Sequence, residues 1–161
     1  MIRRATGADH TWIADVAADV YGALGDYGSI IRSWLAHPGV LTYLDEERDA
    51  DARSAPVARG FTLLGFYEPN TVGPYVADLL AIAVARPFQR HGVGTSLLQH
   101  AIHLAGLATR ANNPLEMRLT VAETNEVGRH FFTSFGFRIL DEDHGHYDGG
   151  QRAIRMMRPL P

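Results

Sequence analysis

The chain contains no cysteine among its 161 residues. This absence excludes a disulfide framework, a thiolate metal site and a cysteine nucleophile. Its apolar runs are all shorter than the roughly 20 residues that a membrane-spanning helix needs. Residues 1–6 do not provide the apolar core of a signal peptide. We therefore expect a cytoplasmic protein that makes no use of a membrane.

Positive charge is not in excess either. The sequence has 15 Lys and Arg residues against 18 Asp and Glu residues, which gives a formal net charge of −3. A basic surface for nucleic acid is therefore not expected. The content of 46% hydrophobic and 20% charged residues is ordinary for a globular protein. The length fits one domain over residues 1–161, and no internal repeat or linker divides it.

The most informative segment is 79–108. An apolar run over 79–84 predicts a strand, which must end before Pro87. Gly92 and Gly94 then open a helix with apolar residues at the spacing of one buried face: Val93, Leu97, Leu98, Ala101, Ile102, Ala105 and Ala108. Backbone N–H groups at a helix start have no intrahelical partner and attract anions. This segment could therefore bind a phosphate or pyrophosphate, with Arg90 and His91 adding positive charge.

Alternative interpretations of the glycine pair must be weighed. A dinucleotide-binding fingerprint needs a third glycine and an acidic residue about 20 positions later. Here the third glycine is missing and position 112 is Asn. The Gly-Lys-Ser/Thr of a nucleotide phosphate loop is also absent. The glycine pair alone does not exclude a strand-to-helix turn that binds no ligand.

Gln89-x-x-Gly92-x-Gly94 resembles the Q/R-x-x-G-x-G/A signature of the GCN5-related N-acetyltransferase (GNAT) superfamily. Residues 82–84 resemble the strand end that carries the thioester in this family. Asn125 with the phenylalanines of 131–137 is similar to its second coenzyme A motif, and Tyr147-x-Gly149 completes the usual order. The resemblance implies that acetyl-CoA is bound by Ile82, Ala83, Val84, Gln89, Arg90, His91, Gly92, Val93, Gly94, Thr95, Asn125 and Phe132.

The expected elements follow the order of the same family. They are strands over 2–5, 40–44, 57–67, 75–85, 116–122, 137–141 and 151–158, and helices over 9–24, 27–36, from the glycines to about 112–114, and 125–135. Residues 45–56 are charged without an apolar period and are interpreted as a flexible connector. This order resembles the acyl-CoA N-acyltransferase fold, an α+β three-layer architecture. It implies a mixed, mostly antiparallel seven-stranded sheet with helices on both faces. The parallel strands 75–85 and 116–122 would splay apart to admit the pantetheine arm.

Acetyl transfer requires a neutral amine. Neutralising a lysine-like amine at pH 7 costs about 4.6 kcal/mol, whereas an α-amino group costs only about 1 kcal/mol. Asp78 is the candidate base, because it occupies the strand position at which histone-type members of the superfamily carry a catalytic glutamate. The alternative is a strand-edge carboxylate that pairs with a neighbouring cation or hydrogen-bonds the backbone. Asn125 is expected to cap the helix that follows it.

Phe132 departs from the family pattern. Many members carry a tyrosine there that protonates the leaving thiolate, and phenylalanine cannot do so. Tyr147, His144, His146 or His130 could replace it, and Tyr147 is the candidate that we select. A thiol with a pKa of about 8.5 can also leave without an acid. No metal is expected, because neither His100 with His103 nor His144 with His146 has a further ligand at suitable spacing.

Two functions remain open at this point. The first is an acetyl-CoA-dependent N-acetyltransferase that modifies the primary amine of a small molecule or of a peptide or protein. The second is a non-catalytic protein of the same fold that binds or senses coenzyme A. A homodimer is a further expectation. The acceptor itself is not specified by the sequence.

Overall fold

A computed structural model describes residues 1–51, 53–67, 76–112 and 116–161. Its seven strands form one sheet in the order β1-β2-β3-β4-β5-β7-β6. All neighbouring strands are antiparallel except β4 and β5, which are parallel. This arrangement confirms the expected mixed sheet. The strands are β1 (Ile2–Arg4), β2 (Val40–Glu47), β3 (Val57–Tyr67), β4 (Val76–Val84), β5 (Glu116–Ala122), β6 (Arg138–Asp141) and β7 (Ala153–Pro159). Tyr75, expected to begin β4, lies outside the described residues.

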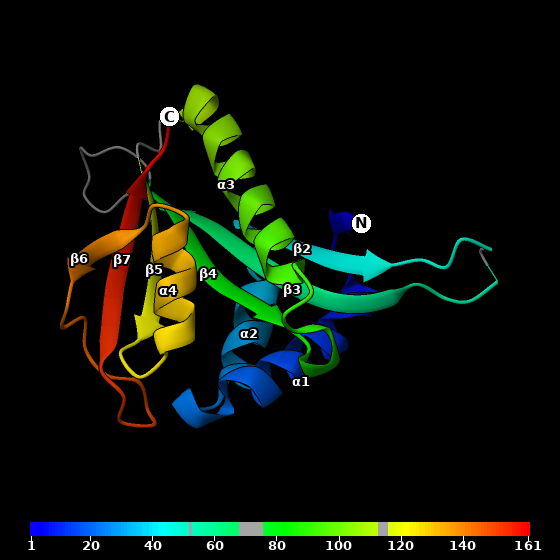
Figure 1. Ribbon diagram of the computed structural model, residues 1–161, viewed down its shortest axis with the longest axis horizontal. Helices are drawn as coiled ribbons and strands as arrows, with labels where there is room; N and C mark the ends of the chain where they lie inside the picture. Colours follow the sequence, from blue (N-terminus) through cyan, green and yellow to red (C-terminus); the bar gives the residue numbers. More distant parts are fainter. Residues whose placement is uncertain (52, 68–75, 113–115) are drawn as a thin grey trace.

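Helices cover both faces of the sheet (Figure 1). One face carries α1 (His10–Tyr21) and α2 (Tyr27–Leu35), whose Ile13 and Ile31 pack against Phe61 of β3. The other face carries α3 (Val93–Asn112) and α4 (Glu126–Ser134), whose Leu98 and Phe132 belong to a second core cluster. The helix expected over 9–24 is α1 flanked by the 3₁₀ turns Gly7–Asp9 and Gly22–Leu24. A third such turn, Arg86–Phe88, precedes α3.

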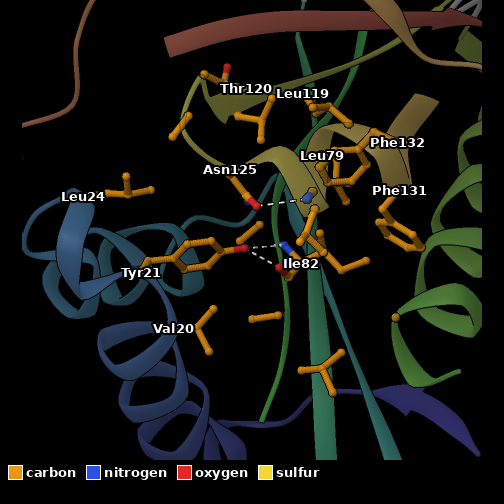
Figure 2. A pocket seen from close by; sticks show the side chains of 18 of the residues that line it. Val20, Tyr21, Leu24, Leu79, Ile82, Leu119, Thr120, Asn125, Phe131 and Phe132 are labelled. Atoms are coloured by element: carbon orange, nitrogen blue, oxygen red, sulfur yellow. Dashed lines mark hydrogen bonds between the residues drawn. The ribbon is translucent and has the colours of Figure 1, made fainter. Parts of the chain in front are cut away.

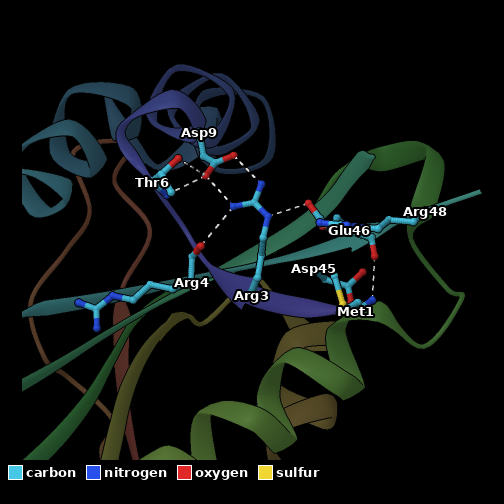
Figure 3. Close-up of polar contacts among 8 residues, drawn as sticks. All are labelled: Met1, Arg3, Arg4, Thr6, Asp9, Asp45, Glu46 and Arg48. Carbon is cyan, nitrogen blue, oxygen red and sulfur yellow. Dashed lines mark hydrogen bonds and ion pairs between the residues drawn. The ribbon is translucent and has the colours of Figure 1, made fainter. Parts of the chain in front are cut away.

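The interpretation of residues 45–47 as flexible connector was wrong. β2 continues to Glu47, and both Asp45 and Glu46 are buried. A shift of register between these two residues allows consecutive side chains to be buried. Arg3 donates from Nε to Glu46 at 2.7 Å and from both Nη atoms to the Asp9 carboxylate (Figure 3). Arg59 donates from Nε to Asp45 at 2.7 Å. Because these charges are paired, a charged sequence here forms a buried strand.

The two parallel strands separate after a short paired segment. β4 and β5 are paired from Val76 with Glu116 to Leu79 with Leu119, and the described register ends there. Beyond this point the edge of β4 that faces β5 is open. This matches the splayed pair expected from the family resemblance.

A bulge in β4 lies at the same place. The register with β3 passes from Leu64–Leu79 to Leu63–Ala81, so that Leu80 has no opposite residue. One extra residue inverts the alternation of side chains along a strand. Leu79 accordingly packs with the α3 and α4 cluster, whereas Ala81 packs with the α1 and α2 cluster.

Candidate functional site

A cavity of about 760 Å³ passes along the open edge of β4. Its walls come from α1 on one face of the sheet and from α4 on the other, so it runs through the gap between β4 and β5. The residues predicted from the sequence that line it are Ile82, Ala83, Val84, Gln89, Arg90, Gly92, Gly94, Thr95, Asn125, Phe132 and Tyr147. Three others do not line it: His91 is exposed on the loop, Val93 is buried in the core, and Asp78 lines a second cavity.

The glycine loop presents the start of α3 to this cavity. Arg90 has φ 66° and Gly92 has φ 81°, and α3 begins at Val93. The left-handed conformation explains the glycine at position 92. Helix geometry leaves the N–H groups of Val93, Gly94 and Thr95 without intrahelical acceptors, which makes this end of α3 suited to an anion.

At Gly94 the space beside the Cα atom limits the length of the side chain, while the backbone conformation does not require glycine. A Cβ atom at this position would lie 3.6 Å from Val84 Cγ2 and 3.8 Å from Phe131 Cζ, which are ordinary contacts. Alanine would therefore fit here, whereas a long side chain would have to enter the cavity that Gly94 lines.

Two side chains cover the open edge of β4. The hydroxyl of Tyr21 donates to the Ile82 carbonyl oxygen and accepts from the Ile82 N–H at 3.2 Å (Figure 2). Gln89 Nε2 donates to the Val84 carbonyl oxygen at 3.0 Å. Burial raises the pKa of Tyr21 well above its ordinary value, so the phenol stays protonated. The sequence places Tyr21 inside the helix expected over 9–24 but gives no sign of this contact, because its partner is 61 residues away.

The short helix α4 supplies the opposite wall. Asn125 is its N-cap and accepts from the Gly128 N–H at 2.9 Å, which confirms the expected cap (Figure 2). Phe132 lies buried between the rings of Phe131 and Phe137, at 5.4 and 5.9 Å between ring centroids. Phe132 lines the cavity but has no group that could donate a proton.

A second cavity of about 340 Å³ adjoins the first. Trp34, Asp78, His144 and Arg155 belong to the second cavity alone. The residues common to both cavities form a shared wall: Tyr27, Leu79, Leu80, Thr120 and Tyr147. The bulge at Leu80 is part of this wall. A group bound in one cavity can therefore meet a group bound in the other.

Asp78 forms an ion pair at the side of the second cavity. Arg155 Nη1 donates to Oδ1 at 3.1 Å and Nη2 donates to Oδ2 at 3.0 Å. The same guanidinium also donates to Thr120 at 3.0 Å and to the Tyr67 hydroxyl at 2.7 Å. Only 9% of the Arg155 side chain and 14% of the Asp78 side chain are exposed. Arg155 is therefore the neighbouring cation expected if Asp78 is a structural carboxylate. The role of Asp78 as base stays a prediction.

Sequence reasoning missed Arg155, although a signal was present. Arg155 is the cation inside the buried stretch 153–157 of β7, whose other arginine, Arg158, lies nearer the end of the strand; Asp78 is the single anion inside the apolar strand β4. Burial alone would lower the pKa of Arg155, but Asp78 and Tyr67 outweigh it and raise that pKa. Two isolated opposite charges in buried strands of one sheet could have been matched as a pair.

The residues considered as acids are differently placed. Tyr147 lies in the shared wall, with its ring 6.3 Å from that of Tyr27. Burial raises the pKa of Tyr147 well above its ordinary value, and Tyr27 adds to the shift. His130 lines the first cavity and His144 the second. His146 is exposed and lies opposite Arg152 in the hairpin before β7.

The described residues contain no group of three or more His, Cys, Asp or Glu side chains that could hold a metal ion. In the same part of the chain, no helix is both long enough and apolar enough to cross a membrane.

Comparisons with known proteins agree with this geometry. The model of the Acetyltransferase (GNAT) family matches residues 21–137. An N-alpha-acetyltransferase of Sulfolobus acidocaldarius is 34% identical over 82 residues, which are 51% of this chain and 47% of that protein. The chain thus matches about half the length of this curated relative.

Solved structures are similar over the whole chain. Arabidopsis thaliana NAA60 in complex with a bisubstrate analogue superposes with a TM-score of 0.78 at 10% identity, over 100% of this chain and 99% of that one. The PaiA N-acetyltransferase of Thermoplasma acidophilum in complex with coenzyme A gives 0.68 at 20% identity, over 99% and 98%. At these identities the likeness establishes the fold.

Proposed function

The chain belongs to the acetyltransferase (GNAT) family, and from this premise we propose that it is an acetyl-CoA-dependent N-acetyltransferase. Its residues 1–161 would act as one acetyltransferase domain. The observation that carries the proposal is the pair of cavities that meet at a shared wall on the open edge of β4. One cavity suits the acyl donor, and the other suits the amine that receives the acetyl group.

The residues of the first cavity fit acetyl-CoA. The start of α3 offers Val93, Gly94 and Thr95 N–H groups to a pyrophosphate, and Arg90 lies beside them. The open edge of β4 offers backbone groups to the amides of a pantetheine arm. The volume of about 760 Å³ lies within the ordinary range of ligand-binding pockets. When bound, acetyl-CoA supplies an acetyl thioester at the shared wall.

The reaction exchanges one bond for another. The acceptor nitrogen attacks the thioester carbonyl carbon, a C–N bond forms and the C–S bond breaks. The nitrogen loses one proton, and the departing sulfur gains one to give the free thiol. The chain must therefore provide, or leave to water, one proton acceptor and one proton donor.

Asp78 is the proposed proton acceptor, directly or through a water molecule. It lies in the second cavity beside Leu79 and Leu80 of the shared wall. Arg155 contacts both carboxylate oxygens and so fixes their orientation, while each oxygen keeps a further lone pair for a hydrogen bond. Arg155 is thus the positioning residue for this base.

For the departing sulfur we favour the route without a protein acid. Phe132 cannot donate, and the pKa of Tyr147 is raised by burial, which makes its proton harder to release. A thiol is a tolerable leaving group near neutral pH. Tyr147 remains the candidate acid if a donor is needed, because it lies in the shared wall.

The acceptor is proposed to be a primary amine of a small molecule or of a peptide or protein. An α-amino group is favoured over a lysine-like amine, because its deprotonation at pH 7 costs about 1 kcal/mol instead of about 4.6. The aromatic side chains of Tyr27, Trp34 and Tyr147 would contact the group next to that amine. A cytoplasmic location and a homodimer stay predictions from the sequence.

A panel of amines incubated with acetyl-CoA tests the function through release of free thiol. Peptides with free α-amines, their Nα-blocked lysine-containing counterparts and small polyamines form its three arms. The chain has no lysine of its own, so no side chain of the enzyme competes as an acceptor. Thiol release with at least one arm is expected. Binding of acetyl-CoA without any turnover would favour the alternative, a non-catalytic coenzyme A-binding or sensing protein. Phe132 supports this alternative, because phenylalanine cannot protonate the leaving thiolate.

A further inference from the structure

Ile82 presents its backbone N–H and C=O groups at a special place on the sheet. It lies on β4 beyond the last residues paired with β5, where the strand edge is open. A buried backbone N–H or C=O group needs a partner, since an unmatched one costs free energy comparable to a lost hydrogen bond. Normally the neighbouring strand supplies that partner. Here β5 has turned away, and the cavity proposed for acetyl-CoA lies against this edge.

Tyr21 supplies both missing partners at once. Its hydroxyl donates to the Ile82 carbonyl and accepts from the Ile82 N–H, as the backbone of an adjacent strand would do (Figure 2). The side chain comes from the last residue of α1, and its ring packs on Tyr27 with centroids 5.0 Å apart. Gln89 covers only the carbonyl of Val84, so Tyr21 is the fuller substitute for a strand.

A pantetheine arm that lies along β4 needs the same groups. Its amides, and the carbonyl of the thioester, could bind the open edge only through backbone N–H and C=O groups such as those of Ile82. The Tyr21 hydroxyl and the donor therefore compete for the backbone N–H and C=O groups of Ile82.

We propose that Tyr21 is a placeholder for the acyl donor: its hydroxyl completes the edge of β4 in the free enzyme and is exchanged for acetyl-CoA on binding. The inference rests on the proposed function, since the donor must be one that lies in this cavity. It assigns Tyr21 to positioning and affinity, with no proton transfer. The placeholder keeps the gap intact when no donor is present, at the expense of donor affinity.

Tyr21→Phe tests the exchange because it removes the hydroxyl and keeps the ring. The free variant should melt at a lower temperature than wild type, since Ile82 loses both partners. Because the competing hydrogen bonds are gone, acetyl-CoA should bind about three- to tenfold more tightly by calorimetry. The rise in melting temperature on adding acetyl-CoA should be larger than in wild type. Tyr43→Phe is the matched control, since it removes the hydroxyl of a tyrosine on β2 that lines neither cavity, and its donor affinity should be unchanged.

The outcomes separate the two proposals. If wild type binds no acetyl-CoA, the proposed function fails and the placeholder fails with it. If wild type binds and Tyr21→Phe binds equally or more weakly, the placeholder alone is refuted. A large loss of kcat in Tyr21→Phe at unchanged donor affinity would instead assign the hydroxyl to the chemistry.

A second measurement needs no variant. In a crystal structure of the wild-type enzyme with coenzyme A, the Tyr21 hydroxyl should no longer contact both the N–H and the carbonyl of Ile82. A ligand atom should take one or both of these hydrogen bonds. Finding both Tyr21 contacts intact with the arm in place would overturn the proposal even if Tyr21→Phe did not fold.

Discussion

Replacement of Asp78 by asparagine should affect stability and catalysis for different reasons. The substitution keeps the shape of the side chain but leaves the guanidinium of Arg155 buried without its carboxylate. With 9% of Arg155 and 14% of Asp78 exposed, solvent can compensate little. Removing one member of a buried ion pair typically costs 3–5 kcal/mol, and the remaining contacts to Tyr67 and Thr120 reduce this to about 2–4 kcal/mol. The melting temperature should then fall by about 5–12 °C.

A double-mutant cycle separates this structural effect from a role as base. Arg155→Met leaves the carboxylate unpaired and should also destabilise the protein, whereas Asp78→Asn with Arg155→Met removes both charges. The double variant should recover about 2 kcal/mol relative to the sum of the single variants in urea unfolding. Additive losses, with no coupling between the two positions, would refute the interpretation of the pair as a buried ion pair.

Activity within the same cycle tests the chemistry. If Asp78 is the base, kcat/KM should fall about 100-fold or more in Asp78→Asn and stay low in the double variant, although its stability has recovered. The loss should be greatest below pH 8 and should shrink at higher pH, where more of the amine is already neutral. Recovery of activity together with stability, or an unchanged pH–rate profile in Asp78→Asn, would leave Asp78 with a purely structural role.

Three further outcomes are expected. Gly94→Glu should abolish the thermal stabilisation that millimolar acetyl-CoA gives to wild type, whereas Gly94→Ala should retain it, because only the longer side chain must enter the cavity. Tyr147→Phe should keep near-wild-type kcat if the thiolate leaves unaided; a loss of 10²–10⁴-fold with intact donor affinity would make Tyr147 the acid. Arg3 and Arg48 lower the pKa of Glu46, so its stabilisation is present above the unfolded-state pKa and lost as pH falls below it. The difference in unfolding free energy between wild type and Glu46→Gln should therefore shrink on acidification from pH 7; a difference independent of pH would contradict this.

The parts of the site that could be predicted from the sequence are those that local pattern determines. The apolar run, the glycines and the helix periodicity place the start of α3 after the end of β4. Asn125 caps α4 through a hydrogen bond to a residue only three positions later in the sequence. The contacts that were missed join residues far apart in sequence: Tyr21 with Ile82, and Asp78 with Arg155. The bulge at Leu80 was hidden for another reason. Residues 79–84 are all apolar, so no alternation of polar and apolar side chains marks where the strand changes face.

The open end of the sheet needs a connection that strand pairing does not provide. β4 and β5 separate after Leu79 and Leu119, yet the two cavities need a wall of fixed width between them. The hairpin before β7 supplies this connection. The Gly149 N–H donates to the Leu24 carbonyl at 3.1 Å, and Gln151 Nε2 donates to the Ala23 carbonyl at 2.9 Å. A Cβ atom on residue 149 would lie 2.1 Å from the Ala23 oxygen, so this approach requires glycine. The connection ties the half of the sheet that carries α1 to the half that carries β7, and Tyr147, two residues before Gly149, is thereby held in the shared wall. The glycine that resembles part of a family motif in the sequence thus acts here by fixing the gap in which donor and acceptor would meet.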